Sequence, residues 1–484
     1  MNKKILLSLF LISPLAISCS KSEPVSTASK YNYRDVYIHN NYYRRSTAPN
    51  KGDVNLLVIP VWFSDSDNYI ALDKKDSVRD DIEKAYFGSD EEVGWKSVSS
   101  FYEEDSFHTV HLKGVVTPWF EVSNASTDYY SSDNNNTLRL IKKGIEWYRT
   151  IAEDSTLKDF DADHDGYLDG VAMIYACADY MNIDTGGQDN LWAYCSWNFG
   201  ALSTKNKPSL MNYFWASYDF LYGSNALERT GFNYRNGDTR YLNIDTHCFI
   251  HEMGHNFGLP DYYDYSGSMS YSGGFSMQDY NVGAHDPHSA FSLGWVKPIV
   301  PTGNKQIKLR SYVDTGDFIL LSPKYDRSAF DEYILIELFT PTGLNKFDCT
   351  YQYKDRYPSG TNEPVIRIWH VDSRLFDYDQ NKLKTVPEGK MIFEATSNNS
   401  TEEQWYPNYK KLSLIRNNND YATYNEMYEA EDTDYFRTGD TFSLNQFSKQ
   451  FYRGYKLNKN VELGFTVSIG EITGEYALIN IVKQ

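Results

Sequence analysis

Apolar residues are distributed differently in the two halves of the chain. The stretches 55–63 and 170–176 are almost continuously apolar, a pattern typical of strands that are covered on both faces. The same reading predicts a strand at 110–116 and helices at 97–102, 138–151 and about 246–257. This half is therefore predicted to be an α+β domain that contains a mixed sheet.

After Pro298 the pattern changes to short strands in which apolar and polar residues alternate. These strands are expected at 333–338, 365–369, 465–469 and 476–481. Short alternating strands with turn-rich connections are typical of a β-sandwich. A chain of 484 residues is also too long for one ordinary hydrophobic core. We therefore predict an α+β domain over 51–298 and an all-β, sandwich-like domain over 299–484.

The N-terminus has the features of an export signal. Lys3 and Lys4 precede an apolar run at 5–17, which is too short to span a membrane in the mature protein. The run ends in Ala-Ile-Ser before Cys19, which resembles a bacterial lipoprotein signal, although Ala16 stands where Leu is usual. We predict a signal peptide over 1–18 and lipidation of Cys19. The protein is then exported and anchored by its lipid to the bacterial cell envelope, and which membrane face it occupies, including the cell surface, is left open. An ordinary secretory signal is the alternative.

Residues 19–50 are polar and rich in Ser, Asn and Tyr, so they are predicted to form a tether and a loosely held lead-in. No other apolar run reaches about 18 residues, so membrane contact is expected only through the lipid anchor. The formal charge of −18 argues against nucleic acid as a partner. The expected partners are protein or peptide substrates. The protein is expected to be a monomer.

The remaining cysteines do not form a metal site with Cys-x-x-Cys spacing. Cys177 and Cys195 could pair in an oxidising compartment, or both could be buried thiols. The 41 tyrosines suit either a recognition surface or aromatic cores and loops.

The predicted helix near residue 250 carries a motif of metal chemistry. His251 and His255 are four residues apart, so both imidazoles emerge from one helical face and suit two ligands of a tetrahedral zinc ion. Glu252 follows the first histidine and is predicted to be the general base that takes a proton from a metal-bound water. Tyr280 is a candidate second donor to the oxyanion, on proximity in sequence alone.

A third ligand is expected just after this helix. Gly258 can adopt the left-handed conformation that ends a helix, and Pro260 prevents its continuation. The turn can therefore return Asp261 to the zinc, with Asp264 as the alternative third ligand. His247 lies on the same helical face, but a ligand two turns away from His255 is about 12 Å along the axis. It is interpreted as a structural residue or a partner of a ligand.

A second metal site is predicted in an acidic loop before the strand at 170–176. Alternating aspartates place oxygen donors around one point, and Gly166 permits the sharp turn that a calcium loop needs. The expected calcium ligands are Asp161, Asp163, Asp165, Asp169 and the backbone carbonyl of Tyr167. A solvated acidic turn is the alternative.

These motifs together resemble the immune inhibitor A-like metallopeptidases, secreted bacterial zinc proteases related to the metzincins. The resemblance rests on the run HEMGHNFGLPDYYD at 251–264, and it extends to segments at 63–65, 100–106, 273–277, 287–296 and, more weakly, 368–372. It implies a metzincin-like zinc peptidase domain with a mixed sheet and an active-site helix, and a methionine turn at Met277. Phe275 departs from the family pattern, which has Trp there.

The leading hypothesis is a zinc-dependent endopeptidase that hydrolyses extracellular proteins. The competing hypothesis is a non-catalytic surface lipoprotein that binds glycan or host protein through its β-rich domain. A narrow amidase or a protease for glycosylated proteins stays open. The presence of Glu252 favours catalysis, because a relict site would most readily lose the base.

Overall fold

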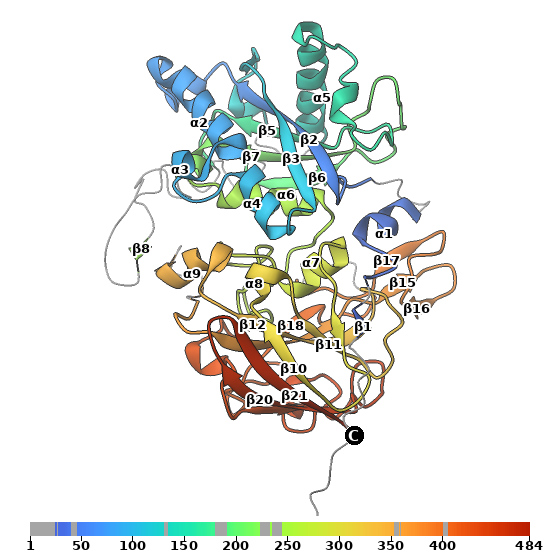
Figure 1. The fold of residues 1–484 in the computed structure, drawn as a ribbon. Coiled ribbons are helices and arrows are strands. Elements are labelled where there is room, and N and C mark those ends of the chain that lie inside the picture. Colours follow the sequence, from blue (N-terminus) through green and yellow to red (C-terminus); the bar gives the residue numbers. More distant parts are fainter. Residues whose placement is uncertain are drawn as a thin grey trace, which may run out of the picture.

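The computed structural model describes residues 25–26, 28–39, 46–129, 134–179, 191–222, 233–234, 244–352, 358, 360–399 and 405–484. It is a mixed α and β structure, with a mixed sheet in the N-terminal part and several β-sheets in the C-terminal part (Figure 1). The predicted signal peptide and Cys19 lie outside the described residues. No described helix has the length and the apolar character needed to cross a membrane.

The N-terminal part is built on a sheet of order β3-β2-β5-β7-β6, with β4 paired to the end of β2. All its strand pairs are parallel except β6 with β7, which is antiparallel. The strands are β2 (Gly52–Trp62), β3 (Val110–Val116), β4 (Phe120–Glu121), β5 (Gly170–Tyr175), β6 (Tyr194–Trp197) and β7 (Asn212–Ser217). The strands predicted at 55–63, 110–116 and 170–176 are confirmed.

Helices cover both faces of this sheet, which explains its continuous apolar strands. They are α2 (Lys75–Phe87), α3 (Asp90–Val93), α4 (Val98–Asp105), α5 (Asn134–Ile151) and α6 (His247–Asn256). Because side chains alternate along a strand, Leu56 and Val58 pack on the side of α2, α4 and α6. Leu57 and Ile59 point to the other side, against α5. The helix that contains His251 and His255 thus packs on one face of this sheet.

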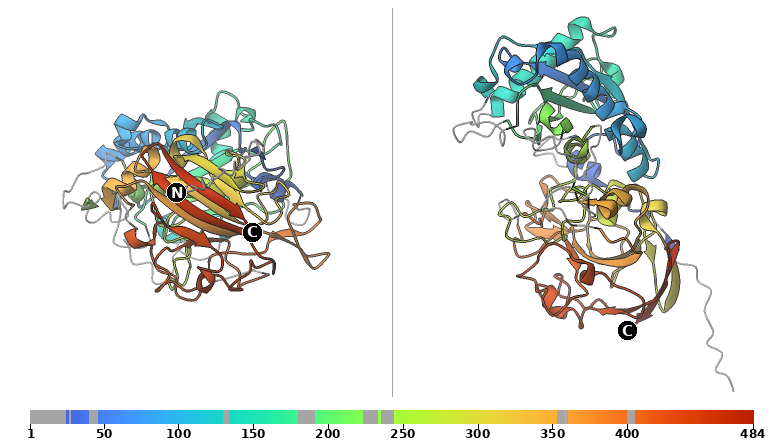
Figure 2. Two further views of the ribbon diagram at one scale, coloured as in Figure 1. Left: turned by 60° about the horizontal axis from the view of Figure 1, so that its bottom comes forward. Right: turned by 90° about the vertical axis from the view of Figure 1, so that its left-hand side faces the viewer.

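The C-terminal part contains two larger sheets, of orders β1-β9-β11-β12-β14-β18 and β10-β21-β20-β19. The first comprises β1 (Val25–Ser26), β9 (Ile299–Val300), β11 (Ile319–Leu321), β12 (Glu332–Phe339), β14 (Val365–Asp372) and β18 (Leu412–Ile415). The second comprises β10 (Lys305–Arg310), β19 (Thr441–Ser443), β20 (Phe465–Ile472) and β21 (Tyr476–Lys483). Side chains from both sheets, among them Ile336 and Ile479, belong to one hydrophobic cluster. Figure 2 shows the C-terminal strands from two further sides.

Smaller elements complete the structure. A three-stranded sheet is formed by β15 (Leu375–Asp377), β16 (Lys382–Lys384) and β17 (Ile392–Glu394), and a two-stranded one by β8 (Asn233–Tyr234) and β13 (Tyr351–Gln352). Short helices are α1 (Tyr33–His39), α7 (Pro287–Leu293), α8 (Tyr312–Thr315) and α9 (Lys346–Thr350). Single 3-10 turns lie at 66–68, 72–74, 126–129, 158–160, 218–222, 343–345, 432–434 and 448–450.

The two parts share a hydrophobic core at their junction. Tyr102 of α4 and Phe257 both pack against Trp295, with ring centroids 6.1 and 5.6 Å apart. On the other side of the junction, Phe291 of α7 contacts Tyr333 of β12 at 6.3 Å. One cluster of buried side chains therefore runs from α6 into the C-terminal sheet. The predicted domain boundary at 298/299 stays a prediction.

Part of the segment predicted to be a loose tether is packed. Strand β1 pairs with β9, and Tyr33 of α1 is buried, with its hydroxyl donating to Glu394 at 2.6 Å. Ala48 is also buried, and its backbone N–H donates to the carbonyl of Asn256 at 2.8 Å. The polar composition concealed this packing, because the tyrosines supply apolar surface along with hydrogen-bonding hydroxyls.

The cysteines of the described residues form no disulfide. Cys177 lies in the cluster on the α5 side of the sheet, whereas Cys195 packs against the cluster on the other side. The pairing considered for these two residues is therefore prevented by their positions. Burial raises the pKa of the Cys177 thiol to about 12, so it is an unreactive core residue.

Candidate metal site

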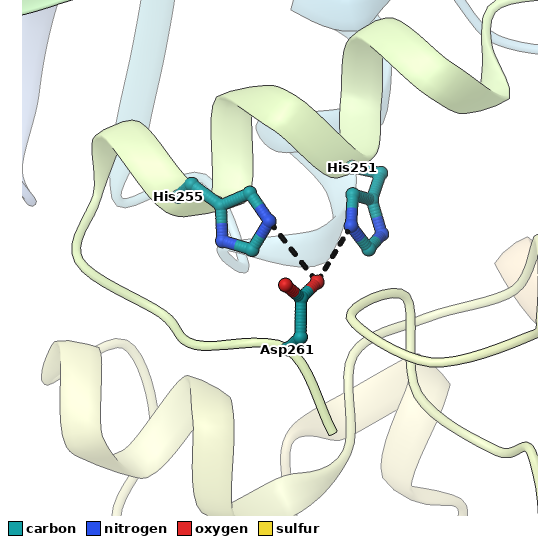
Figure 3. A group of neighbouring side chains, drawn as sticks. All are labelled: His251, His255 and Asp261. Atoms are coloured by element: carbon teal, nitrogen blue, oxygen red, sulfur yellow. Dashed lines mark hydrogen bonds and ion pairs between the residues drawn. The ribbon is translucent and has the colours of Figure 1, made fainter. Parts of the chain in front are cut away.

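The end of α6 brings together the three residues predicted to bind zinc. His251 and His255 lie one turn apart, and the chain turns back after α6 through Gly258, whose φ is +104°. Asp261 Oδ1 then lies 3.0 Å from His251 Nε2 and 3.2 Å from His255 Nε2. Figure 3 shows both imidazoles facing this carboxylate from one side of the helix. Potential ligand atoms of the three residues all lie within 4.8 Å of one another.

The other ring nitrogens determine which tautomer each histidine adopts. His251 Nδ1 lies 2.8 Å from the Met277 carbonyl oxygen, and His255 Nδ1 lies 2.7 Å from that of Leu259. A carbonyl oxygen accepts only, so each Nδ1 carries a hydrogen and donates it. In the neutral rings, each Nε2 then presents a lone pair to Asp261.

This donor set fits a divalent metal ion. Two imidazole lone pairs and a carboxylate oxygen converge on one point, and such acceptors repel one another unless a cation lies between them. Without a metal, a proton on a histidine would have to supply the positive charge between these atoms. Burial lowers the pKa of His255, but the negative charge of Asp261 has the larger effect and raises that pKa to about 9. Burial would raise the pKa of Asp261, yet the two histidines hold it far below its usual value.

Glu252 lies beside this group with an unsatisfied carboxylate. It is 5% exposed, and its Oε2 has no hydrogen-bond partner among the described residues. Burial raises the pKa of Glu252, and the neighbouring His255 and His251 oppose this rise. A buried carboxylate that has no partner and whose pKa is shifted toward neutrality is suited to accept a proton.

The alternatives to these residues have other contacts. His247 Nε2 lies 2.9 Å from the carbonyl oxygen of Asn281, away from the metal-binding group. Asp264 Oδ2 accepts from the backbone N–H groups of Ser268 and Met269, both at 3.2 Å, so it orders its own turn. Asp261 is thus the carboxylate that lies with the two histidines.

The loop after Asp261 adds aromatic residues to the site. Tyr263 contacts the His251 ring at 6.3 Å and the ring of Tyr280 at 5.3 Å. The hydroxyl of Tyr265 donates to Asp261 Oδ2 at 2.7 Å, a contact that the sequence reading missed. Its only sequence signal is a tyrosine close behind a predicted ligand. Tyr280, the predicted oxyanion donor, is therefore adjacent to the site through Tyr263.

The segment predicted to contain the methionine turn also contacts the site. Met277 is fully buried, and its contact with His251 is through its backbone carbonyl. Phe275 is buried against the guanidinium of Arg367, 3.9 Å from its ring centroid. The phenyl ring at this position is therefore packed by side chains of the C-terminal part.

The acidic loop brings together three of its predicted ligands. Carboxylate oxygens of Asp161, Asp163 and Asp169 lie within 4.8 Å of one another, and Gly166 has a φ of +90°. Burial raises the pKa of Asp169 to about 8. Asp161 Oδ1 is buried and has no hydrogen-bond partner in the described part of the chain. The clustered oxygens suit a hard cation such as calcium.

Asp165 does not belong to this group of carboxylates, and the ligand role of the Tyr167 backbone carbonyl stays a prediction. Asp165 Oδ2 accepts from Ser46 Oγ at 2.6 Å and from the Arg34 guanidinium at 2.8 Å. Arg34 also forms an ion pair with Asp163. The Tyr167 hydroxyl donates to the carbonyl of Ala201 at 3.1 Å. The N-terminal segment thus supplies a positive charge to the loop, which could not be read from the loop sequence.

Neither a scan against models of protein families nor a search of curated proteins found a match.

Proposed function

We propose that this protein is a zinc-dependent endopeptidase. The observation that carries the proposal is the arrangement on α6 and the turn after it. Two imidazoles with their Nε2 lone pairs and the Asp261 carboxylate converge on one point, and the buried, unpartnered Glu252 lies next to them. A metal held by three protein ligands with a carboxylate base alongside is the architecture of hydrolytic zinc sites.

The donor set favours zinc over harder cations. Calcium and magnesium prefer oxygen ligands, whereas two imidazoles and one carboxylate are a frequent zinc set. When bound, zinc supplies a Lewis acid that polarises a carbonyl and lowers the pKa of water to about 7. His251, His255 and Asp261 would hold it, and the carbonyls of Met277 and Leu259 keep both rings in the tautomer that this requires.

Glu252 would perform the proton transfers. Its carboxylate takes a proton from the attacking water and then gives it to the leaving amine, which breaks the peptide bond. Burial raises its pKa, which favours acceptance of this proton. The C–O bond forms at the scissile carbonyl carbon, and the C–N bond breaks.

The architecture supports an extended peptide as substrate. Among the described residues, β6 is the outermost strand of the N-terminal sheet, and it packs against α6. An edge strand can pair with an added peptide segment through main-chain hydrogen bonds. A polypeptide laid along β6 would pass near the metal-binding end of the helix.

The finer fold assignment is part of the proposal. A metzincin-like, immune inhibitor A-like domain is supported by the 251–264 motif, by Met277 behind His251, and by the mixed sheet. A sandwich-like C-terminal domain is supported by the hydrophobic cluster between the two larger sheets. Export and lipidation at Cys19 rest on the N-terminal sequence alone.

Cleavage of an unfolded protein tests the proposal. The purified protein with zinc is incubated with an unfolded general substrate, and the products are sequenced by mass spectrometry. We expect peptides produced by cleavage at internal bonds. A His251→Ala variant purified in parallel excludes a contaminating protease and is expected to give none. Absence of peptides from wild-type protein that carries zinc would contradict the proposal.

Calcium at the acidic loop is proposed as a structural ion held by Asp161, Asp163 and Asp169. We expect that removing calcium lowers the melting temperature even when zinc is kept saturating, because the carboxylates then repel one another. At a calcium concentration of 100 times its Kd, the lost stabilisation is about 2.7 kcal/mol. Calorimetry with and without a calcium-selective chelator measures this.

A matched variant sharpens the calcium experiment. Asp161→Asn is expected to melt at the same temperature with and without calcium, while wild type responds. A wild-type melting temperature that does not change on calcium removal would mean that the loop is a solvated acidic turn.

A further inference from the structure

Gln278 lies against the metal-binding helix, one residue after Met277. It is fully buried. Its Nε2 donates to the backbone carbonyl of His251 at 3.3 Å and lies 3.3 Å from Nδ1 of His255. One side-chain amide therefore contacts both histidines of the site, and it meets the His255 ring at the nitrogen that does not face Asp261.

The helix contains a glycine where this amide approaches. A Cβ at Gly254 would lie 2.0 Å from Gln278 Oε1 and 2.7 Å from its Cδ. Glycine is a poor helix former, and residue 254 lies inside α6. The close approach of the Gln278 amide to the helix explains the glycine at residue 254, because any larger residue there would displace Gln278.

Two more buried side chains lie next to Gln278. His285 Nδ1 donates to Asp105 Oδ2 at 2.7 Å, and His285 Nε2 lies 3.1 Å from Gln278 Oε1. The other oxygen of Asp105 accepts the backbone N–H of His285 at 3.0 Å. The Gln278 amide nitrogen faces the His251 carbonyl, which only accepts, so the orientation that places Nε2 toward α6 is the favourable one.

The far end of this chain of contacts is anchored in α4. Asp105 is the last residue of α4, and Tyr102 on the same helix donates from its hydroxyl to the carbonyl of Ile250 at 2.7 Å. Asp105 and His285 are both almost fully buried. The contacts thus connect α4 to the rear of α6 (Figure 1).

We propose that Asp105, His285 and Gln278 are positioning residues for the metal-binding histidines. Gln278 donates to the His251 backbone carbonyl and packs against the rear of the His255 ring, whose Nδ1–H is donated to Leu259, while Asp105 and His285 support the amide from its other side. This positioning role rests on the proposed function, because it requires that His251 and His255 bind zinc. Partners of metal ligands commonly change metal affinity by about 10- to 100-fold when they are replaced.

The experiment measures zinc binding rather than hydrolysis. The zinc affinity of the full chain is determined against a competing chelator, and the visible spectrum of the cobalt-substituted protein reports ligand geometry. We expect Gln278→Met, which keeps the size but removes the hydrogen bonds, to weaken zinc binding about 10- to 100-fold and to alter the cobalt spectrum.

Asp105→Asn provides a second test in case Gln278→Met does not fold. It is expected to weaken zinc binding by a smaller factor. Because Asp105 acts through Gln278, adding Asp105→Asn to Gln278→Met is expected to cause little further loss. An additive loss, or Asp105→Asn with wild-type zinc affinity, would contradict the chain of contacts.

Gln450 offers a matched control. It is also fully buried, its Nε2 donates to the Arg416 carbonyl at 2.8 Å and its Oε1 accepts from Arg416 N at 2.8 Å, but it lies outside the site. Gln450→Met is expected to lower stability and to leave zinc affinity and the cobalt spectrum unchanged. A folded Gln278→Met with the wild-type affinity and spectrum overturns the positioning role alone. Wild-type protein that binds no zinc overturns the proposed function, and the positioning role with it.

Discussion

Replacing Glu252 with Gln is expected to lower kcat for peptide hydrolysis by about 10²- to 10⁴-fold, the range for loss of a general base. Glutamine has the same size, so packing at this buried position is preserved, but its amide cannot accept the proton of the attacking water. The loss should appear in kcat, with KM little changed. Steady-state kinetics on a quenched-fluorescence peptide measures it.

Bound zinc distinguishes loss of the base from loss of the site. Glu252→Gln is expected to retain zinc, because the ligand atoms belong to His251, His255 and Asp261. Glu337→Gln is the matched control: Glu337 is likewise buried, but it accepts from Trp369 Nε1 in the C-terminal part. We expect wild-type kcat in this control. Full activity in Glu252→Gln would assign the base to another residue.

Replacing Asp261 with Asn is expected to weaken zinc binding by more than about 100-fold. Replacing a residue that only hydrogen-bonds to a metal ligand lowers metal affinity by about 10- to 100-fold. Asp261→Asn removes a charged ligand atom itself, the one that lies between the two imidazoles. Hydrolysis at limiting zinc should fall with it. Competition with a chelator of known affinity measures the change.

Asp264→Asn is the control that the sequence itself provides. Asp264 was the alternative third ligand, and its carboxylate instead accepts hydrogen bonds within its own turn. We expect Asp264→Asn to keep wild-type zinc affinity. The reverse result, with zinc lost in Asp264→Asn and kept in Asp261→Asn, would move the third ligand to residue 264.

The helical face of the two histidines and the turn after them could be predicted from the sequence, because both depend on residues that are close together in the chain. The spacing of His251 and His255 fixes their common face on a helix, and Gly258 takes the left-handed conformation that ends it. The continuous apolar run at 55–63 similarly predicted a strand covered on both faces, which β2 is. In each case the periodicity or the turn residue determines the structure.

Contacts between distant segments could not be read in this way. Gln278 contacts His251 across 27 positions, and Arg34 reaches Asp165 across 131. Nothing in their own surroundings marks either residue as part of a site. The packing of Tyr33 was missed for the same reason, since its partner Glu394 lies 361 positions away. Such contacts follow from tertiary structure, not from spacing.

Titrating the metal-free protein with zinc, while hydrolysis and bound zinc are measured in the same samples, tests the proposed zinc peptidase most directly. With a single group formed by His251, His255 and Asp261, the predicted rate rises in proportion to bound zinc and stops rising at one zinc per chain. Hydrolysis by the metal-free protein, or one bound zinc per chain without hydrolysis of any unfolded protein, would contradict the account.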